Sequence, residues 1–216
     1  MLITSVETRL SQLGVVPIVS LPRASVAVPL ARALVDGGLG CAEITLRTPD
    51  ALQGLAAIRE AFPDLLLGAG TVLDVAQVSD AVAAGADFIV APGTNPDVVA
   101  ASQERGVSIL PGVATPSEID LARRLGVRTL KFFPAEPLGG ARTLGVLCGP
   151  FADVSFVPTG SIEPSLLPDY LRLPQVIACG GSWMVSPQLL AERDFDRVRT
   201  LATEARAIVD AVRGPS

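Results

Sequence analysis

One lysine stands alone among the basic residues of this 216-residue chain, at position 131. Every other basic residue is an arginine, which stays protonated and cannot act as a nucleophile, whereas a lysine can lose its proton. Lys131 lies in a mostly apolar run and is followed by Phe132 and Phe133. Apolar neighbours favour the neutral amine, which can attack a ketone carbonyl and form a Schiff base. A strand-end lysine that reaches solvent is the alternative, but the aromatic neighbours and the isolation of Lys131 favour a nucleophile.

A carboxylate lies within a second apolar stretch, which reads Cys41-Ala42-Glu43-Ile44-Thr45-Leu46-Arg47. Burying a carboxylate costs free energy unless it has a partner or a task. In a strand, Glu43, Thr45 and Arg47 share one face, because side chains alternate between the two faces. This face could present a carboxylate base and a guanidinium to one ligand. A purely structural Glu43–Arg47 ion pair is an equally good interpretation.

Glycine and hydroxyl residues cluster where the expected strands end. The clusters after the third, fourth, fifth, seventh and eighth strands read Gly68-Ala69-Gly70-Thr71, Ala91-Pro92-Gly93-Thr94, Pro111-Gly112, Thr159-Gly160-Ser161 and Gly180-Gly181-Ser182. Glycine lets a ligand approach the backbone, and N–H groups with hydroxyls at a helix start bind phosphate without a basic side chain. Ordinary turns and helix caps would explain each cluster alone. Two such clusters after the last two strands favour a phosphate site.

Histidine is absent, which removes the commonest general base and the commonest metal ligand, so no metal or cofactor is expected. The net charge of -5, without a basic block, argues against nucleic acid as a partner. No apolar run reaches the ~18 residues of a membrane span, and no secretory signal is expected at the start. The cysteines at 41, 148 and 179 lack disulfide or metal spacing, which indicates a reducing cytoplasm.

Short apolar runs alternate with amphipathic stretches along the chain, as is typical of strands buried on both faces of a parallel sheet. Strands are predicted at 15–20, 41–45, 65–69, 87–91, 107–110, 127–132, 154–157 and 175–178. Helices are predicted at 25–36, 49–61, 74–84, 95–105, 116–125, 137–147, 163–170 and 186–213, the last broken near 192–194. Eight strand-helix units predict an α/β fold, a single (β/α)8 TIM-barrel domain over 1–216. A doubly wound open sheet would alternate similarly.

The chain resembles the bacterial 2-keto-3-deoxy-6-phosphogluconate (KDPG) aldolases of the Entner–Doudoroff pathway. The matching stretches, in order, are ALVDGGLGCAEITLRTPDAL, LLLGAGTVL, GADFIVAPG, LPGVATPSE, LKFFPAEPLGG, GPFADVSFVPTG and ACGGSWMV. KFFPAE and GGSW are the distinctive ones. The resemblance implies a class I aldolase, a lyase, on a (β/α)8 barrel that assembles as a homotrimer and cleaves a phosphorylated 2-keto acid.

By this resemblance Lys131 is the Schiff-base nucleophile, and Glu43 is the general acid and base that works through a water. Arg47 and Thr71 match positions that hold the carboxylate and keto region of the substrate. Pocket-lining positions are matched by Pro92 and Phe133. The phosphate-binding loops contain Thr159, Gly160, Ser161, Gly180, Gly181 and Ser182. The family usually reads Thr-Gly-Gly-Ile where this chain has Ser161 in place of the second glycine, so the serine could add a hydroxyl contact or crowd the phosphate.

Other activities fit part of the pattern. Enzymes that cleave 4-hydroxy-2-oxoglutarate (KHG) or 2-keto-3-deoxy-6-phosphogalactonate are the alternatives among aldolases, and the galactonate branch differs around the segments TLRT and KFFPAE. A sugar-phosphate isomerase or epimerase would share the phosphate loops but would not need Lys131, and such enzymes usually depend on histidine. A non-catalytic phosphate-binding protein would bind the ligand without releasing pyruvate.

Overall fold

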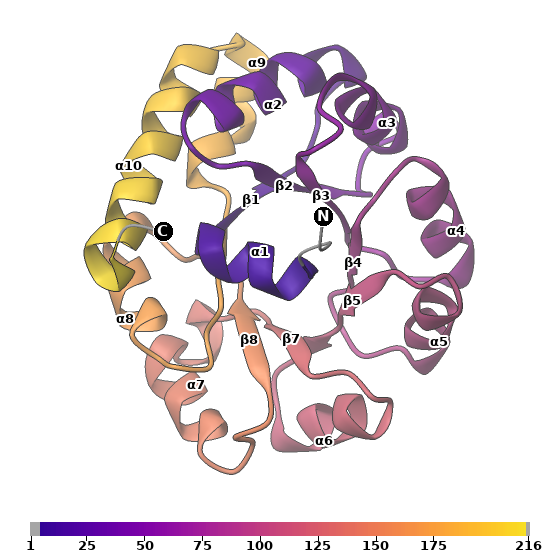
Figure 1. Cartoon of the computed structure of the whole chain (residues 1–216), viewed down its shortest axis with the longest axis vertical. Helices are drawn as coiled ribbons and strands as arrows, with labels where there is room; N and C mark the ends of the chain where they lie inside the picture. Colours follow the sequence, from indigo (N-terminus) through magenta and orange to yellow (C-terminus); the bar gives the residue numbers. More distant parts are fainter. Residues whose placement is uncertain (1–4, 215–216) are drawn as a thin grey trace.

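The computed structural model describes residues 5–214, in which parallel strands form two curled sheets surrounded by helices (Figure 1). The six-stranded sheet has the order β5-β4-β3-β2-β1-β9, and the three-stranded sheet has the order β6-β7-β8. The strands are β1 Val15–Val19, β2 Cys41–Thr45, β3 Leu66–Gly70, β4 Phe88–Val90, β5 Ser108–Leu110, β6 Gly112–Val113, β7 Thr129–Phe132, β8 Ser155–Pro158 and β9 Cys179–Gly181. Isolated bridges pair Phe156 with Val176 and Thr159 with Gly180, so β8 meets the segment that contains β9.

Helices α2 to α10 lie outside the strands, and α1 lies across the middle of the ring in Figure 1. Their bounds are α1 Val6–Leu13, α2 Ala27–Asp36, α3 Ala51–Ala61, α4 Val75–Ala83, α5 Pro96–Glu104, α6 Pro116–Arg124, α7 Gly140–Cys148, α8 Leu167–Leu171, α9 Pro187–Glu192 and α10 Phe195–Arg213. Short 3-10 turns are η1 Ala24–Val26, η2 Glu136–Leu138, η3 Pro164–Leu166 and η4 Trp183–Val185. Capping residues stabilise the first turn of several helices. At α6, for example, Thr115 and Glu118 form a capping box, with Pro116 in the first turn.

Alternation along the strands separates the buried apolar residues into two clusters. One cluster includes Ala42, Ile44, Leu130 and Phe132 and packs the strands against the helices. The other comprises Leu10, Val16, Cys41, Leu66, Phe88, Val90, Leu110, Val157 and Ala178. This second group, named here the inner cluster, fills the space that the curled strands enclose. The odd positions of β2 and β7 point to this interior, which places Glu43 and Lys131 there.

Most elements expected from the sequence are present within a residue or two, including the break of the last helical region at Arg193 and Asp194. The eighth predicted strand is displaced, because β9 pairs with β1 at Cys179–Gly181 and only Val176 of the predicted segment makes a bridge. Gly180 and Gly181 therefore lie in a strand and not in the loop after it. Hydrophobicity marks burial, and two glycines give no hydrophobic signal for the pairing that defines a strand. Strand β3 likewise includes Gly68 and Gly70.

Helix α1, which lies outside the expected helices, covers the interior at the end where the strands begin. Leu10 of α1 is fully buried and belongs to the inner cluster. The guanidinium of Arg9 donates to the carbonyl of Asp64, and that of Arg213, at the end of α10, donates to the carbonyl of Ser11. These contacts hold α1 in place as a cover over the interior.

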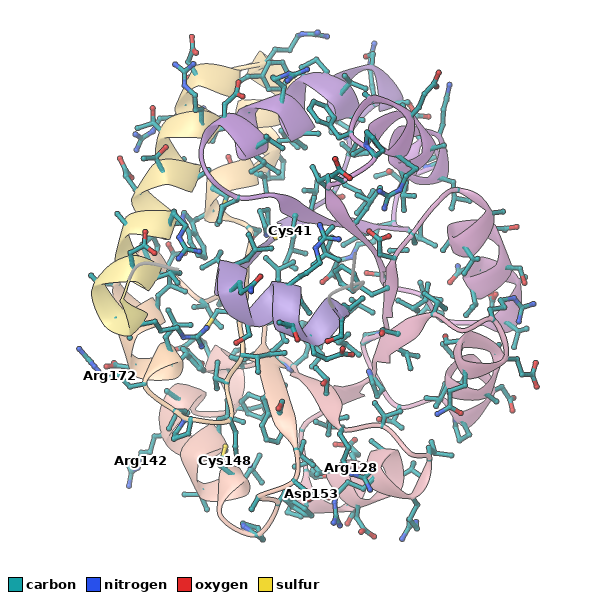
Figure 2. All side chains as sticks on the ribbon, in the orientation of Figure 1. Cys41, Arg128, Arg142, Cys148, Asp153 and Arg172 are labelled. Atoms are coloured by element: carbon teal, nitrogen blue, oxygen red, sulfur yellow. The ribbon has the colours of Figure 1, made fainter. Side chains whose placement is uncertain are left out.

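The three cysteines are all free thiols. Figure 2 shows Cys41 near the centre of the ring and Cys148 among the outer helices. Burial raises the pKa of the Cys41 thiol to about 12, so this thiol is neutral near pH 7 and donates to the carbonyl of Val15. Among residues 5–214, no helix is both long and apolar enough to cross a membrane.

We expect Leu10→Ala to lower the free energy of unfolding by about 2–5 kcal/mol, because it leaves a cavity under the strands. The control is Val146→Ala, since Val146 is 74% exposed and the loss of its side chain should change stability by less than about 0.5 kcal/mol. Urea unfolding of both variants measures the difference. Equal effects of the two substitutions would mean that α1 is not a packed cover.

Candidate active site

A charged pair lies inside the ring of strands. Lys131 comes from β7 in the three-stranded sheet and Glu43 from β2 in the six-stranded sheet, and their Nζ and Oε1 atoms are 3.4 Å apart. The two residues are 4% and 3% exposed, respectively. A buried charge requires a partner, and this contact provides one for each group. Glu43 therefore faces Lys131 and not Arg47, so the structural ion pair considered for Glu43 and Arg47 is wrong.

Apolar side chains surround the amine of Lys131. The small internal space beside Lys131 and Glu43 is lined by Leu10, Val16, Phe88, Val90, Leu110, Val157 and Thr159. The Nζ atom also lies 5.4 Å from the centre of the Phe133 ring, within the range of a cation–π contact. These neighbours keep bulk water from the amine and leave the carboxylate as the closest polar group. The surroundings suit a lysine that reacts as an amine and not as a surface charge.

Glycine in β3 makes room for the carboxylate. Thr45 of β2 pairs in register with Gly70 of β3. A Cβ atom at Gly70 would lie 2.1 Å from Oε1 of Glu43, far inside van der Waals contact. A Cβ atom at Gly68 would similarly lie 2.3 Å from the ring of Phe88. The two glycines that the sequence suggested as ligand-approach positions thus accommodate side chains of the site itself.

An open cleft of about 410 Å³ lies at the carboxyl ends of the strands. Its lining includes Ile18, Ser20, Thr45, Arg47, Phe133, Thr159, Gly160, Ser161, Ile162, Glu163, Gly180, Gly181, Ser182, Trp183, Val185, Ser186 and Pro187. Arg47 is the one basic residue in this lining, whereas six of its side chains carry a hydroxyl group. Thr159 lines both the cleft and the space beside Lys131, so it stands at the junction between them.

Two non-glycine residues at the site have positive φ angles, a conformation that favours glycine. Ser161 has a φ of 57°, which explains why a glycine suits this position in the phosphate-loop pattern. Thr71 has a φ of 59°, and its Oγ1 accepts a hydrogen bond of 3.1 Å from Nε of Arg47. Arg47 is exposed in the turn after β2, so it is not on the strand face with Glu43. The guanidinium of Arg47 is instead oriented by its hydrogen bond to Thr71, which directly follows the neighbouring strand β3.

The structure brings most of the expected site residues together. Eight of them line the cleft, namely Arg47, Phe133, Thr159, Gly160, Ser161, Gly180, Gly181 and Ser182. Thr71 does not line the cleft but accepts a hydrogen bond from Arg47, which does. Pro92 lines a separate hollow with Val72 and Asn95. Lys131 and Glu43 lie beneath the cleft.

Sequence reasoning missed several residues of the cleft, among them Ser20, Glu163 and Trp183. Ser20 directly follows β1, so the rule that site residues gather after strands would have found it. Trp183 lies in the distinctive GGSW motif. A Cβ atom at Gly181 would lie 1.7 Å from the Trp183 ring, so the glycine allows the indole to fold back over β9.

Comparison with known proteins assigns the chain to a family. The model of the KDPG and KHG aldolase family matches residues 6–201. A 2-dehydro-3-deoxy-phosphogluconate aldolase from Treponema pallidum is 50% identical over 200 residues, which are 93% of this chain and 95% of that protein. The KHG/KDPG aldolase of Escherichia coli K12 is 42% identical over 94% of this chain and 95% of its own length.

A solved structure agrees with these relatives. The KDPG aldolase from Legionella pneumophila, with pyruvate captured as a covalent carbinolamine intermediate, superposes with a TM-score of 0.90 at 37% identity. The match covers 94% of this chain and 98% of that one. The chain described here belongs to the KDPG and KHG aldolase family.

Proposed function

We propose that this chain is a class I aldolase that reversibly cleaves 2-keto-3-deoxy-6-phosphogluconate to pyruvate and glyceraldehyde 3-phosphate. The observation that carries the proposal is the only lysine of the chain, buried 3.4 Å from a carboxylate beneath the cleft. Relatives of 40–50% identity over nearly the whole chain are named for this reaction. A structural neighbour holds pyruvate as a carbinolamine, the adduct that precedes a Schiff base.

Bond formation begins at Lys131. The Lys131 ammonium releases a proton, and the neutral amine adds to the C2 ketone. A proton is taken up again when the carbinolamine hydroxyl group leaves as water, which gives a protonated imine. Glu43 then removes the proton of the C4 hydroxyl group. The C3–C4 bond breaks, the aldehyde forms at C4, and the electron pair moves through C3 to the imine nitrogen as an enamine. Glu43 returns a proton to C3, and hydrolysis of the imine releases pyruvate and the free amine.

The cleft provides for both ends of such a substrate. Arg47, oriented by Thr71, is placed to bind the C1 carboxylate, for which a guanidinium is well suited. The phosphate would lie against the loop at Thr159–Ser161 and the end of β9 with Ser182, where backbone N–H groups and hydroxyls replace basic side chains. Phe133, which lines the cleft, is a proposed pocket wall, and Pro92 stays a proposal only, since it lines a separate hollow. A substrate held in this way would extend past Thr159, from the amine below to the loops above.

Cleavage of 4-hydroxy-2-oxoglutarate is a second candidate activity, because the Escherichia coli relative is named for both substrates. The same amine and carboxylate would act on it, and only the tail of the substrate would differ. The galactonate analogue stands behind these two, since the segments TLRT and KFFPAE agree with the gluconate branch. An isomerase or a non-catalytic phosphate binder would leave the buried Lys131–Glu43 pair without a task.

We also infer that the two sheets close into one (β/α)8 barrel that forms a single domain over 1–216. The bridges between β8 and the β9 segment support closure on one side, and the passage from β5 into β6 through Pro111 supports it on the other. Homotrimer assembly and a cytoplasmic location stay predictions. The exposed apolar residues Leu73 and Val75, beside the hollow that contains Pro92, are candidates for a contact between subunits.

Incubation with pyruvate and borohydride should add one three-carbon unit at Lys131, because reduction fixes the imine on the only lysine. Peptide mass spectrometry locates the adduct. The control Lys131→Arg keeps a positive charge opposite Glu43 but cannot form an imine, so it should show no adduct there and no pyruvate release. Modification of the N-terminal amine alone, with Lys131 unmodified in the wild type, would refute the mechanism.

Glu43→Gln should slow carbon–carbon cleavage by ~10²–10⁴-fold, the usual effect of losing a general acid or base, while imine formation largely remains. Single-turnover cleavage, borohydride trapping and thermal unfolding are measured on the same samples. The rival interpretation is a structural pair, whose disruption costs about 3–5 kcal/mol of stability. A clearly lowered melting temperature with near-normal turnover per folded molecule would assign Glu43 to structure.

A further inference from the structure

A buried tyrosine is joined to the segment that follows the catalytic strand. The hydroxyl of Tyr170, on α8, donates a hydrogen bond to Oε1 of Glu136, the first residue of η2. Tyr170 is 1% exposed and is the only tyrosine of the chain. A Cβ atom at Gly140 would lie 2.9 Å from Oε1 of Glu136 and 3.3 Å from the Tyr170 oxygen. The glycine therefore leaves the space in which these two side chains meet.

The backbone of the same segment holds a loop of the cleft. The N–H of Glu136 donates to the carbonyl of Gly160 at 3.2 Å, and the N–H of Ala135 donates to the carbonyl of Thr159 at 2.8 Å. A Cβ atom at Gly160 would lie 3.1 Å from the nitrogen of Ala135, so the two loops are in close contact. A continuous chain of contacts thus runs from α8 through Glu136 to the cleft.

The hydrogen bond between Tyr170 and Glu136 persists because of the chemistry of the two side chains. Burial, followed by the hydrogen bond to Glu136 and the charge of Glu136, raises the pKa of the Tyr170 hydroxyl far above its ordinary value. The hydroxyl therefore keeps its proton and remains a donor throughout the working pH range. A hydrogen bond to a carboxylate is stronger than one between neutral groups. Displacement of Glu136 would break this bond and shift the loop at Gly160 with it.

No basic side chain of the cleft lining comes from residues 159–161 or 180–182. An anion bound there would depend on backbone N–H groups and hydroxyls, so the position of the loop matters. We propose that Tyr170 and Glu136 are a positioning pair that fixes the Thr159–Ser161 loop to receive the phosphate group of the substrate. Neither side chain lines the cleft. The substrate end concerned is that of the proposed aldolase function, on which this inference rests.

The decisive variant is Tyr170→Phe, which keeps the ring and removes the hydrogen bond. The KM for the phosphorylated substrate should rise about tenfold, the equivalent of ~1.4 kcal/mol, while kcat changes much less. The KM for 4-hydroxy-2-oxoglutarate, which lacks phosphate, and pyruvate trapping at Lys131 should stay near wild type. Equal losses for both substrates would overturn the proposal in favour of general destabilisation.

Three further variants separate an effect on the position of the loop from an effect on protein stability. Glu136→Gln keeps an acceptor oxygen for Tyr170 and should largely preserve the KM for the phosphorylated substrate, whereas Glu136→Leu should match Tyr170→Phe. Ser102→Ala removes a different buried hydrogen bond, within α5, and should leave both KM values unchanged even if stability falls. Ultraviolet titration of the only tyrosine should show ionisation at lower pH in Glu136→Gln than in the wild type. Ionisation of wild-type Tyr170 at its ordinary pKa would overturn the pair.

Phosphate binding can be measured without catalysis, because Trp183 is the only tryptophan and lines the cleft. Titration with inorganic phosphate, followed by Trp183 fluorescence, should give a weaker Kd for Tyr170→Phe than for the wild type and Ser102→Ala. An unchanged Kd would overturn the proposal. A wild-type protein that binds phosphate but releases no pyruvate would instead count against the aldolase function, so the two failures are distinct.

Discussion

Two opposite charges enclosed in one apolar interior impose the main constraint on this molecule. Removing an ammonium and a carboxylate from water costs several kcal/mol for each ion, and only a close partner offsets it. Lys131 and Glu43 come from different sheets, so their contact depends on how those sheets face each other. Gly70 leaves room for the carboxylate, and Leu10 of α1 covers the interior from below. The chemistry of the site and the packing of the fold therefore depend on the same few contacts.

The site combines two environments with different solvation. Below Thr159, apolar side chains surround the Lys131–Glu43 pair and exclude bulk water from it. Above it, an open cleft presents hydroxyls and backbone to solvent, which suits a phosphate that would be costly to bury fully. A keto acid with a phosphorylated tail would bring its C2 carbonyl to the amine and leave both anionic ends, the C1 carboxylate and the phosphate, in the cleft. The arrangement thus separates the reacting carbonyl from the charged ends of the substrate by dielectric surroundings as well as by specific contacts.

The sequence predicted the parts of this site that depend on residue type and local periodicity. Lys131 and Glu43 were recognisable because a single lysine and a carboxylate in an apolar strand are unusual wherever they fold. The partner of Glu43 was not, because strand periodicity relates Glu43 only to residues of its own strand, whereas Lys131 approaches from the other sheet. The pairing of β9 also depends on tertiary contacts, which a run of hydrophobic residues does not encode. Helix α1 does carry local signals, an N-cap at Ser5 and a left-handed C-cap at Gly14, but a search for hydrophobic runs does not detect them. The positive φ of Ser161 agrees with the glycine usual at that position of the motif, although the strain itself is visible only in the backbone.

The segment from 130 to 140 shows why a motif can extend well beyond its reactive residue. Lys131 supplies the amine, and two residues later the ring of Phe133 lies over it. The backbone of the next turn holds the loop that begins at Thr159, and its carboxylate, Glu136, is anchored by Tyr170. Gly140 then leaves space for that anchor. Each position makes a different contact, so under the proposed function a shift of Lys131 relative to Glu136 would misplace either the imine carbon or the phosphate group. A rigid spacing between the two is what an enzyme needs when both ends of one substrate must be held at once.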